Sequence, residues 1–343
     1  MVDAAVIGAS VAGSAVAIGL GRAGMRTLLV DKAEFPRPKP CGEGLLPHGV
    51  EALRALGLPE PPGTRVAGIR YHAPSGASAE ARFDDAGLGH GLVVRREEFD
   101  AWLLGHARAT PNVEVRTGFE ARPDIDAPVV VGADGLRSMF HGRGRFVRTH
   151  PRRERAGVST HVRGVRVDEF VDVYLADGGE AYVGPCGKGE ASLAVLLERG
   201  VSFDEFVARV PALRGMEVVT RKLGAAPLGS RVSPLVDGRV LLVGDAAGAP
   251  DPVTGEGMSL ALQSAAAACA AIRSGDLASY ERERRRLEAP SARMGRLILW
   301  ASRWFAERAV RRLARDPSLF HRLLRHLCGR EELGVLEPAR LLL

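Results

Sequence analysis

The sequence predicts an α/β (α+β) protein in which a Rossmann-like nucleotide-binding domain is interleaved with a mostly antiparallel β-sheet domain and followed by helices. Three observations support this fold class. Residues 3–34 have the order strand, glycine-rich turn, helix and second strand. Two later apolar strands, near residues 128–132 and 240–244, run into turns that hold glycine and aspartate. Between these segments lie short runs typical of strands, bounded by glycine and proline.

The first segment is a βαβ unit with a nucleotide-binding pattern. Gly8, Ser10 and Gly13 stand at the GxGxxG positions, and Asp31 ends the second strand. Gly8 permits the turn, residue 10 must let the backbone approach a pyrophosphate, and Gly13 lets the helix pack on the strand. Ser10 replaces the usual glycine and slightly restricts that approach. Asp31 would accept hydrogen bonds from a ribose; a tightly packed turn without a ligand is the alternative.

Short strands are predicted between the nucleotide-binding segments, where they would form a sheet over the site. Residues 65–83 indicate a hairpin around Pro74-Ser75-Gly76. Further strands are expected at 157–165, 171–176, 180–186, 191–198 and 217–223, with a helix at 203–213 packed across them. The pocket walls are then mostly aliphatic, with Tyr71, Tyr174 and Tyr182 as hydrogen-bonding exceptions.

Two further strands are predicted to deliver an acidic residue to the site. The strand within residues 128–140 ends at Asp134-Gly135, which alone would be an ordinary turn. The strand within residues 241–265 delivers Asp245 and continues through Gly-Glu-Gly into a helix. The free N–H groups of that helix start would carry positive partial charge, which suits an anionic or electron-rich ligand.

Two amphipathic helices are predicted near the C-terminus. The apolar residues of 291–305 fall on one stripe with arginines off it, and Asp316-Pro317 begins a second helix with its own Leu/Phe stripe. Such stripes usually belong to a core, so we expect these helices to pack on the nucleotide-binding domain and shield the substrate cavity. The alternative is a basic amphipathic surface that contacts an anionic membrane.

Composition excludes several classes of protein. With 343 residues and 46% hydrophobic content, the chain can bury a large core. The four cysteines are far apart and lack zinc-ligand spacing, so we expect a reducing compartment, no disulfide framework and no metal site. The apolar start lacks the basic region of a signal peptide, and no run is long enough to span a membrane, which predicts a cytoplasmic protein.

Charge and histidine placement exclude other functions. The net charge is +6, and residues 281–343 hold fifteen Arg against eight acidic residues, so the rest of the chain is close to neutral. Aromatic residues make up 5% of the chain, so nucleic acid is not an expected partner. His48, His72, His90 and His161 are isolated in the sequence and receive no catalytic role.

The three segments, in this order, resemble the flavoprotein hydroxylase superfamily, the fold group of para-hydroxybenzoate hydroxylase. The resemblance extends to about residue 285. It implies FAD in a domain of the glutathione-reductase type, with Asp134 and Asp245 near the pyrophosphate and ribityl chain and residues 252–258 under the flavin ring. The family has an arginine that touches the flavin chain, and the resemblance implies that Arg96 has this role here. Arg95 is expected to point to solvent.

The resulting set of predicted FAD-binding residues spans all three segments. It comprises Gly8, Ser10, Val11, Ala12, Gly13, Asp31, Lys32, Gly42, Arg96, Asp134, Gly135, Gly244, Asp245, Pro252, Gly255, Glu256, Gly257 and Met258. Glu256 is unusual in this set, because a carboxylate would oppose the negative charge that gathers on a reduced flavin. We therefore expect its side chain to point away and cap the helix or hold a neighbouring loop.

The segment at 37–58 indicates a branch within this superfamily. Its "KPCGEGLLP" is similar to the KxCGxGLxP segment of the geranylgeranyl reductase branch, which implies that Cys41 lies near the flavin ring as a candidate catalytic residue. A small buried apolar side chain is the alternative. Reductases of that branch carry a YxWxFP segment along the lipid channel, and at 181–198 the sequence keeps Tyr182 and Pro185 but no Trp or Phe. No WxWxIP segment of flavin halogenases is present.

The resemblance implies a discontinuous arrangement. The FAD-binding domain comprises 1–64, 88–150 and 224–285, the substrate domain 65–87 and 151–223, and the C-terminal helical region 286–343.

Three functional hypotheses remain open. The first is an NAD(P)H-dependent flavin monooxygenase of secondary metabolism, which hydroxylates a hydrophobic aromatic or polyketide-like metabolite; NAD(P)H would bind transiently, since no second βαβ unit is visible. The second is a geranylgeranyl reductase-like ene-reductase acting on a prenyl lipid. The third is a nicotinamide dehydrogenase or nucleotide-binding module that uses the first βαβ unit alone. The expected partner is a hydrophobic small molecule, and no obligate protein partner is indicated.

Overall fold

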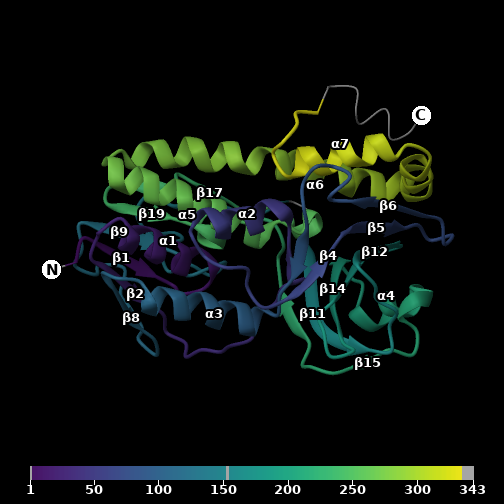
Figure 1. The fold of residues 1–343 in the computed structure, drawn as a ribbon, viewed down its shortest axis with the longest axis horizontal. Coiled ribbons are helices and arrows are strands. Elements are labelled where there is room, and N and C mark those ends of the chain that lie inside the picture. Colours follow the sequence, from purple (N-terminus) through teal and green to yellow (C-terminus); the bar gives the residue numbers. More distant parts are fainter. Residues whose placement is uncertain (1, 152–153, 334–343) are drawn as a thin grey trace.

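A computed structural model of the chain describes residues 2–151 and 154–333. The molecule has two halves side by side: a half built on a parallel sheet, which holds the N-terminus, and a half built on a mixed sheet (Figure 1). The last two helices run along one side of both halves. This arrangement confirms the predicted Rossmann-like domain combined with a second β-sheet.

The first sheet brings the three predicted nucleotide-binding turns to one edge. Its spatial order is β18 (Val236–Asp237), β19 (Val240–Leu242), β9 (Val129–Gly132), β1 (Ala4–Ile7), β2 (Thr27–Val30) and β8 (Val113–Arg116). All neighbours are parallel except β18 and β19. β1, β9 and β19 are adjacent, so the turns after them meet at the carboxyl ends of the strands, the usual ligand edge of such sheets.

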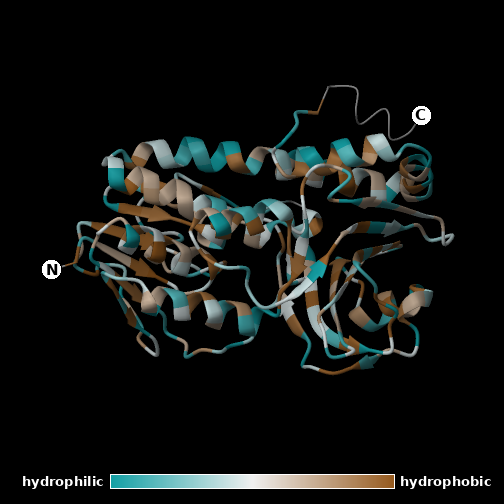
Figure 2. Ribbon diagram, viewed as in Figure 1, coloured by the Kyte–Doolittle hydropathy of each residue, from teal (hydrophilic) through white to brown (hydrophobic). Residues whose placement is uncertain are grey.

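Helices cover this sheet and begin at the same edge. They are α1 (Val11–Arg22), α2 (Pro47–Ala55), α3 (Arg96–Ala109) and α5 (Gly257–Ser274), with 3₁₀ helices η2 (Gly244–Ala247) and η3 (Pro252–Thr254) leading into α5. α1 packs against α5 and α3. Strands β1 and β2 are buried throughout and consist of Ala, Val, Ile, Leu and Thr, as expected for strands covered on both faces (Figure 2).

The second sheet is mostly antiparallel. Its order is β15 (Glu217–Val218), β11 (Arg155–Arg163), β14 (Ala191–Glu198), β13 (Gly179–Pro185), β12 (Phe170–Ala176), β5 (Gly68–His72) and β6 (Ser78–Arg82), with β16 (Leu223–Ala225) also on β11. Two small sheets complete the fold: β3 (Gly44–Leu45), β7 (Gly91–Val93) and β4 (Thr64–Val66), and β10 (Val147–Thr149) with β17 (Arg231–Ser233). The predicted hairpin and the four longer strands are confirmed.

Two predicted elements in this half are wrong in detail. The strand expected at 217–223 is split into β15 and β16. At Thr220, between them, the hydroxyl accepts from the His161 N–H and the carbonyl accepts from the Thr160 hydroxyl, so the regular backbone pairing is interrupted. The single helix expected at 203–213 is shorter: α4 covers Phe203–Arg209, and a separate 3₁₀ turn, η1 (Pro211–Leu213), follows it. Val210 precedes a proline and is extended, as sterics at such positions require.

The C-terminal helices join both halves. α6 (Leu277–Arg315) consists of two helical segments that meet at a kink with non-helical backbone at Phe305, and the helix predicted at 291–305 is the end of the first, longer segment. α7 (Pro317–Leu327) begins at Asp316, whose carboxylate accepts from the Leu319 N–H, as predicted. α6 packs against α5 of the first half, and both helices pack on β6 of the second. None of the described helices is long and apolar enough to cross a bilayer.

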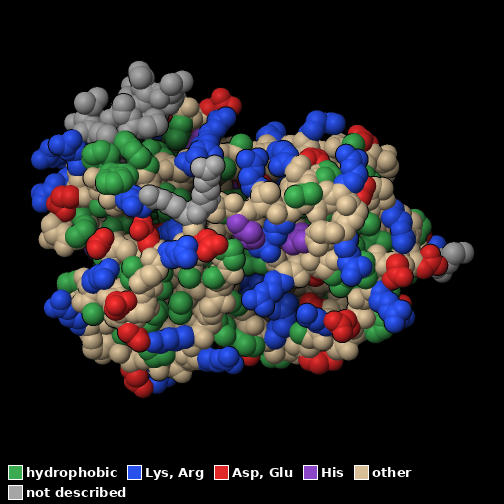
Figure 3. Space-filling model, turned by 180° about the vertical axis from the view of Figure 1, so that it is seen from behind, with side chains coloured by type: hydrophobic (Ala, Val, Ile, Leu, Met, Phe, Trp, Pro, Cys, Tyr) green, Lys and Arg blue, Asp and Glu red, His purple; other side chains and the backbone are tan. Residues whose placement is uncertain are grey.

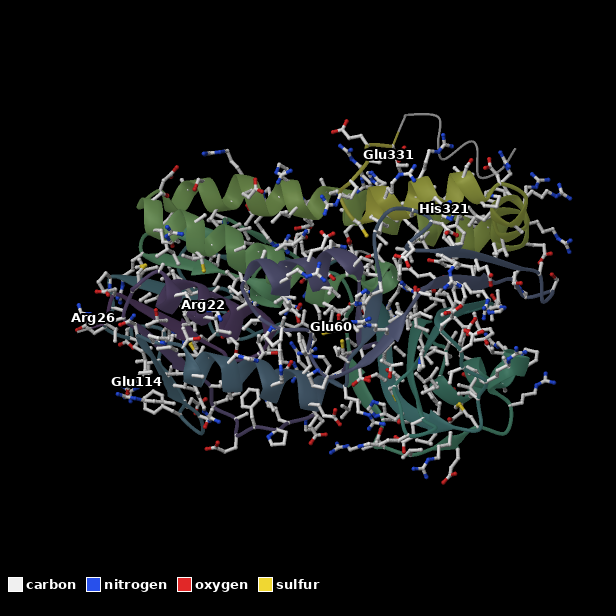
Figure 4. The ribbon with its side chains drawn as sticks, viewed as in Figure 1. Arg22, Arg26, Glu60, Glu114, His321 and Glu331 are labelled. Atoms are coloured by element: carbon white, nitrogen blue, oxygen red, sulfur yellow. The ribbon has the colours of Figure 1, made fainter. Side chains whose placement is uncertain are left out.

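Ion pairs hold the end of this helical region. Glu331, labelled beside α7 in Figure 4, accepts from Arg325 Nε at 2.7 Å, and its backbone carbonyl lies 2.8 Å from His326 Nδ1. Arg330 pairs with Glu51 of α2. These contacts of Glu331 and Arg330 therefore connect the last described turn both to α7 and to the nucleotide-binding half.

Candidate active site

A cavity of about 350 Å³ lies where the two halves meet. Most of the predicted FAD-binding residues line it: Ser10, Val11, Ala12, Gly42, Arg96, Gly135, Gly244, Asp245, Pro252, Gly255, Glu256, Gly257 and Met258, with Cys41 beside them. These residues come from all three segments and from the 37–58 stretch. The convergence predicted from motifs far apart in the chain is thus present in the fold.

The other five predicted residues do not line the cavity. Gly8 and Gly13 act in packing, because a Cβ on Gly8 would overlap the Ala133 carbonyl and one on Gly13 the Gly8 carbonyl. Asp31 is buried, and its two oxygens accept from the N–H groups of Ala9 (2.7 Å) and Ala33 (2.9 Å). The carboxylate expected to bind a ribose therefore holds the glycine turn in place.

Lys32 and Asp134 complete this group. Lys32 is exposed at the surface. Asp134 accepts from the Met139 N–H at 2.7 Å through Oδ2, while its buried Oδ1 has no hydrogen-bond partner among the residues that the structure describes. A buried acceptor without a partner is unusual in a folded protein and suits a ligand that offers a hydroxyl or N–H donor.

The helix starts at this edge are open to an anion. The first turns of α1 and α5 contain no acidic side chain, and no side chain caps either helix. Their first N–H groups are therefore free to face a pyrophosphate or an electron-rich ring. Together with the unpartnered Asp134 oxygen and the glycine turn that leaves no room for a Cβ, this donor set fits FAD.

Ser10 is held by a buried ion pair. Its hydroxyl donates to Asp100 Oδ2 at 2.7 Å and accepts from Arg96 Nη2 at 2.9 Å, and Arg96 also binds Asp100. Burial opposes the charge on both partners, yet Asp100 and Cys41 raise the pKa of Arg96, and Arg96 lowers that of Asp100. Arg96 thus remains a fixed cation in the cavity wall. Sequence reasoning missed Asp100, although its i,i+4 spacing from Arg96 was a signal.

Cys41 lies in a polar corner of the cavity. Its N–H donates to Ser159 Oγ at 3.1 Å, and its sulfur accepts from the Glu43 N–H at 3.3 Å. The carboxylate of Glu43 is buried, and it accepts from the Arg96 N–H at 2.9 Å and lies 2.8 Å from His161 Nε2. His161, which is isolated in the sequence and is expected to have no catalytic role, therefore has a carboxylate partner that comes from the other half.

Two other expectations about side chains are wrong: the helix cap by Glu256 and the solvent position of Arg95. Glu256 makes no capping bond; it pairs with His48 Nε2 at 3.2 Å, with both side chains buried. His48 is therefore a buried partner rather than an isolated residue. Arg95 is half-buried and pairs with Glu190 and the sulfur of Cys186, so it does not point to solvent. His90 likewise lies 2.9 Å from Glu60 Oε2.

His72 pairs with Asp172 at 2.6 Å, so the fourth expected isolated histidine also has a partner. Tyr174 stacks on the His72 ring, with centroids 4.5 Å apart, and does not line the cavity. Tyr71 and Tyr182 do line it, as expected. Tyr182 donates to the Val253 carbonyl at 2.7 Å, which ties the second sheet to the segment before α5.

The far side of the cavity is apolar and is closed by the C-terminal helices. Its walls come from the second sheet, from α6 and from α7, and include Ile69, Phe83, Val173, Leu297, Leu313, Phe320 and Leu324. A polar wall at the nucleotide edge thus faces an apolar chamber. The arrangement can hold a cofactor ring against an apolar substrate and exclude water from both.

Comparison with known proteins identifies the family. The "FAD binding domain" family matches residues 1–124. A digeranylgeranylglycerophospholipid reductase of Methanothermobacter thermautotrophicus is 30% identical over 323 residues, covering 82% of this chain and 81% of that protein. The chain belongs to the geranylgeranyl reductase-like branch of the FAD-dependent oxidoreductases of the para-hydroxybenzoate hydroxylase fold group.

Other members of these FAD-dependent oxidoreductases extend the comparison. A menaquinone reductase of Mycobacterium tuberculosis is 30% identical over 327 residues, covering 80% of this chain and 78% of that protein. Among solved structures, a flavin-dependent brominase has a TM-score of 0.80 at 19% identity, with 99% of this chain and 97% of that chain covered. A probable FAD-dependent monooxygenase of Pseudomonas aeruginosa has a TM-score of 0.67 at 20% identity, covering 88% and 96%. These structural likenesses show the fold.

The predicted cofactor is confirmed as FAD, and the protein is an FAD-dependent oxidoreductase. The hypothesis of a nicotinamide dehydrogenase or nucleotide-binding module without flavin is therefore wrong. The chain is not built on a single βαβ unit: segments after β1, β9 and β19 contribute to one cavity.

Proposed function

We propose that the protein is a flavin-dependent ene-reductase that adds two hydrogens to a carbon–carbon double bond in the apolar chain of a lipid. The observation that carries this proposal is the position of Cys41, on the cavity wall between the nucleotide edge and the apolar chamber. The relatives named as reductases of a digeranylgeranyl phospholipid and of menaquinone support it, since each aligns with about four-fifths of the chain.

The cofactor and several residues of the chain would have separate roles in this reaction. Bound FAD, once an external two-electron donor has reduced it, would supply a hydride to one carbon of the double bond and would be left oxidised. The Cys41 Sγ–H would give a proton to the other carbon, so that two hydrogens are added in all. Arg96, fixed by Ser10 and Asp100, would keep a positive charge in the cavity wall, and the N–H groups at the start of α5 would stabilise negative charge on the ring. The apolar chamber would bind the chain and exclude water.

An NAD(P)H-dependent flavin monooxygenase acting on a hydrophobic aromatic or polyketide-like metabolite is the second candidate. One observation favours it. The branch segment YxWxFP has its Trp two residues after the Tyr, and here Gly184 follows Tyr182 at that distance. A Cβ on Gly184 would lie 2.8 Å from Val93 Cγ2, so no bulky side chain fits there without displacing a neighbour. The Trp of that segment thus has no counterpart at residue 184.

Mass spectrometry of the product separates the two candidates. The purified protein is first checked for bound FAD by its yellow colour, and then supplied anaerobically with chemically reduced FAD and a menaquinone or a geranylgeranyl lipid. A product heavier by two hydrogens supports the reductase. An unchanged substrate under these conditions, together with a product heavier by one oxygen in air with NAD(P)H, contradicts the reductase and supports the monooxygenase.

A further inference from the structure

The second half of α6 carries residues that line the chamber next to residues that are exposed. Its inner face carries Met294, Leu297, Ala301 and Leu313, which line the apolar chamber. Its outer face carries Trp300 and Trp304, 38% and 64% exposed. The chain has three tryptophans, and these two are among its few exposed large hydrophobic residues. One helix layer thus separates the chamber from the outside.

Arginines surround the exposed tryptophans. Arg293, Arg296, Trp300 and Arg303 recur every three or four residues, which places them on one face of the helix, and Trp304 lies at the border between this face and the apolar stripe. The Arg303 guanidinium lies 5.1 Å from the centre of the Trp304 ring. Lys and Arg side chains are spread over the face of the molecule shown in Figure 3. A helix with arginines on its polar face and tryptophans bordering its apolar stripe is typical of segments that lie at a membrane interface.

A groove beside this face has an excess of unpaired positive charge. Five exposed arginines that line it form no ion pair within the described residues: Arg199, Arg231, Arg293, Arg296 and Arg308. The carboxylates of the groove, apart from Glu154, are held by arginines: Asp177 by Arg209, Glu180 and Asp251 by Arg155, Glu198 by Arg303, Glu288 by Arg284 and Glu307 by Arg311. The uncommitted charge is therefore available to an anionic partner.

The groove adjoins the chamber. Gly229, Pro250, Asp251, Ser291, Ser302 and Ala306 line both. An apolar molecule at the groove is thus separated from the chamber by the small side chains Ser302 and Ala306 of α6. A lipid bilayer combines the anionic surface that would suit the arginines with the apolar interior that would suit the tryptophans.

We propose that the outer face of α6 from Arg293 to Arg308 docks on an anionic phospholipid surface and so places the chamber next to its apolar substrate. The inference goes beyond the reaction type, because a reductase and a monooxygenase for apolar substrates would both gain from it. It commits to a lipid rather than a nucleic-acid partner, since the same helix forms the wall of an apolar chamber.

Vesicle binding tests this inference on the full chain with FAD bound. Phosphatidylcholine vesicles with and without phosphatidylglycerol are floated with the wild type and with Arg293→Glu/Arg296→Glu. We expect wild-type binding to need phosphatidylglycerol and to weaken with salt, and the double variant to lose at least about tenfold in partitioning. The matched control is Arg122→Glu/Arg143→Glu, which should bind like wild type, because these two exposed arginines of the nucleotide-binding half form no ion pair within the described residues.

A second variant keeps the test decisive if the charge reversal does not fold. Trp304→Ser should weaken binding and reduce the quenching of tryptophan fluorescence by brominated lipids. The inference is overturned if wild type binds neutral and anionic vesicles equally, if both arginine pairs behave alike, or if the protein binds an oligonucleotide and no vesicle. Flavin absorbance, measured on the same samples, tests the proposed function separately, since a colourless protein that still binds vesicles contradicts the flavin chemistry alone.

Discussion

Ser10 occupies the place where a glycine usually lets the backbone approach a pyrophosphate. Its hydroxyl is bound by Asp100 and Arg96, so the side chain is fixed within the wall of the cavity. The motif predicted that residue 10 lies at the cofactor, and the family resemblance predicted Arg96. Neither could reveal Asp100, because the contact joins residues 90 positions apart that meet once α3 packs on α1.

The four histidines illustrate the same limit. Each is isolated in the sequence, yet His48, His72, His90 and His161 all lie within 3.2 Å of a carboxylate oxygen. For His48, His72 and His161, the carboxylate partner is more than 50 residues away in the sequence, on an element that the fold brings close. Periodicity and motif spacing report on local structure, so they carry no information about such pairs.

Replacing Cys41 tests its role in proton transfer. If the thiol gives the proton in the reductase reaction, Cys41→Ser should lower the turnover rate by about 100-fold or more, since removal of a positioned acid commonly costs that much. The FAD content should not change. Cys186→Ser is the matched control, because Cys186 is half-buried and does not line the cavity. Equal turnover in wild type and Cys41→Ser would mean that Cys41 is a packing residue.

The pair of His48 and Glu256 predicts a pH dependence of stability. Burial disfavours the charged imidazole, but contacts with Cys328 and Glu256 raise the pKa of His48 from 6.5 to about 10. A raised pKa adds stability below pH 6.5, and this contribution is lost as pH rises through 10. The melting temperature should therefore fall more steeply between these pH values in wild type than in His48→Gln. Parallel melting curves for the two proteins would contradict a charged pair.

At the scale of elements, most strands and helices could be predicted, and the exceptions have local causes. The first βαβ unit, the hairpin at 65–83 and the start of α7 at Asp316 follow from turn and capping residues. The split of the strand at 217–223 depends on Thr220 binding across the sheet. The continuity of α6 through Pro290 depends on packing against α5 and β6. Contacts of this kind override local propensity.

Two helical glycines provide a matched test of the glycine turn. Gly13 in α1 has no room for a Cβ, whereas Gly105 in α3 is exposed with nothing within 4 Å of that position. Gly13→Ala should destabilise the protein by about 1–3 kcal/mol or more through overpacking and should reduce FAD binding. Gly105→Ala should be neutral or stabilising by about 0.5–1 kcal/mol. Thermal melts with a flavin titration measure both, and a neutral Gly13→Ala would contradict the close approach of α1 to β1.

At the scale of the whole molecule, contacts between the halves set the shape of the site. Arg155 of β11 binds both Glu180 of β13 and Asp251 of the segment before η3, and Tyr182 binds Val253. Burial raises the pKa of Glu180 to about 7 even with Arg155 beside it. No sequence rule predicts these contacts. The order of the three nucleotide-binding motifs, in contrast, was sufficient to predict that the chain folds around one cofactor.

Cofactor binding should stabilise the whole molecule, because FAD would contact turns after β1, β9 and β19 at once. At a concentration about 1,000 times its Kd, FAD should add about 4 kcal/mol to the free energy of unfolding. Riboflavin lacks the pyrophosphate that would face the start of α1, so it should stabilise much less at the same concentration. Melting curves of the protein stripped of flavin measure both effects. Equal stabilisation by the two compounds would place the pyrophosphate away from α1.

The helices that close the apolar chamber come last in the chain and contribute none of the three glycine-containing turns. Leu297, Leu313, Phe320 and Leu324 can therefore change in size without disturbing the flavin-binding edge. Substitutions at these chamber residues can then change which substrate binds while the flavin-binding residues stay the same. A chimaera that receives α6 and α7 from a relative would exchange these chamber walls as one contiguous segment, and its substrate selectivity should then follow that of the relative.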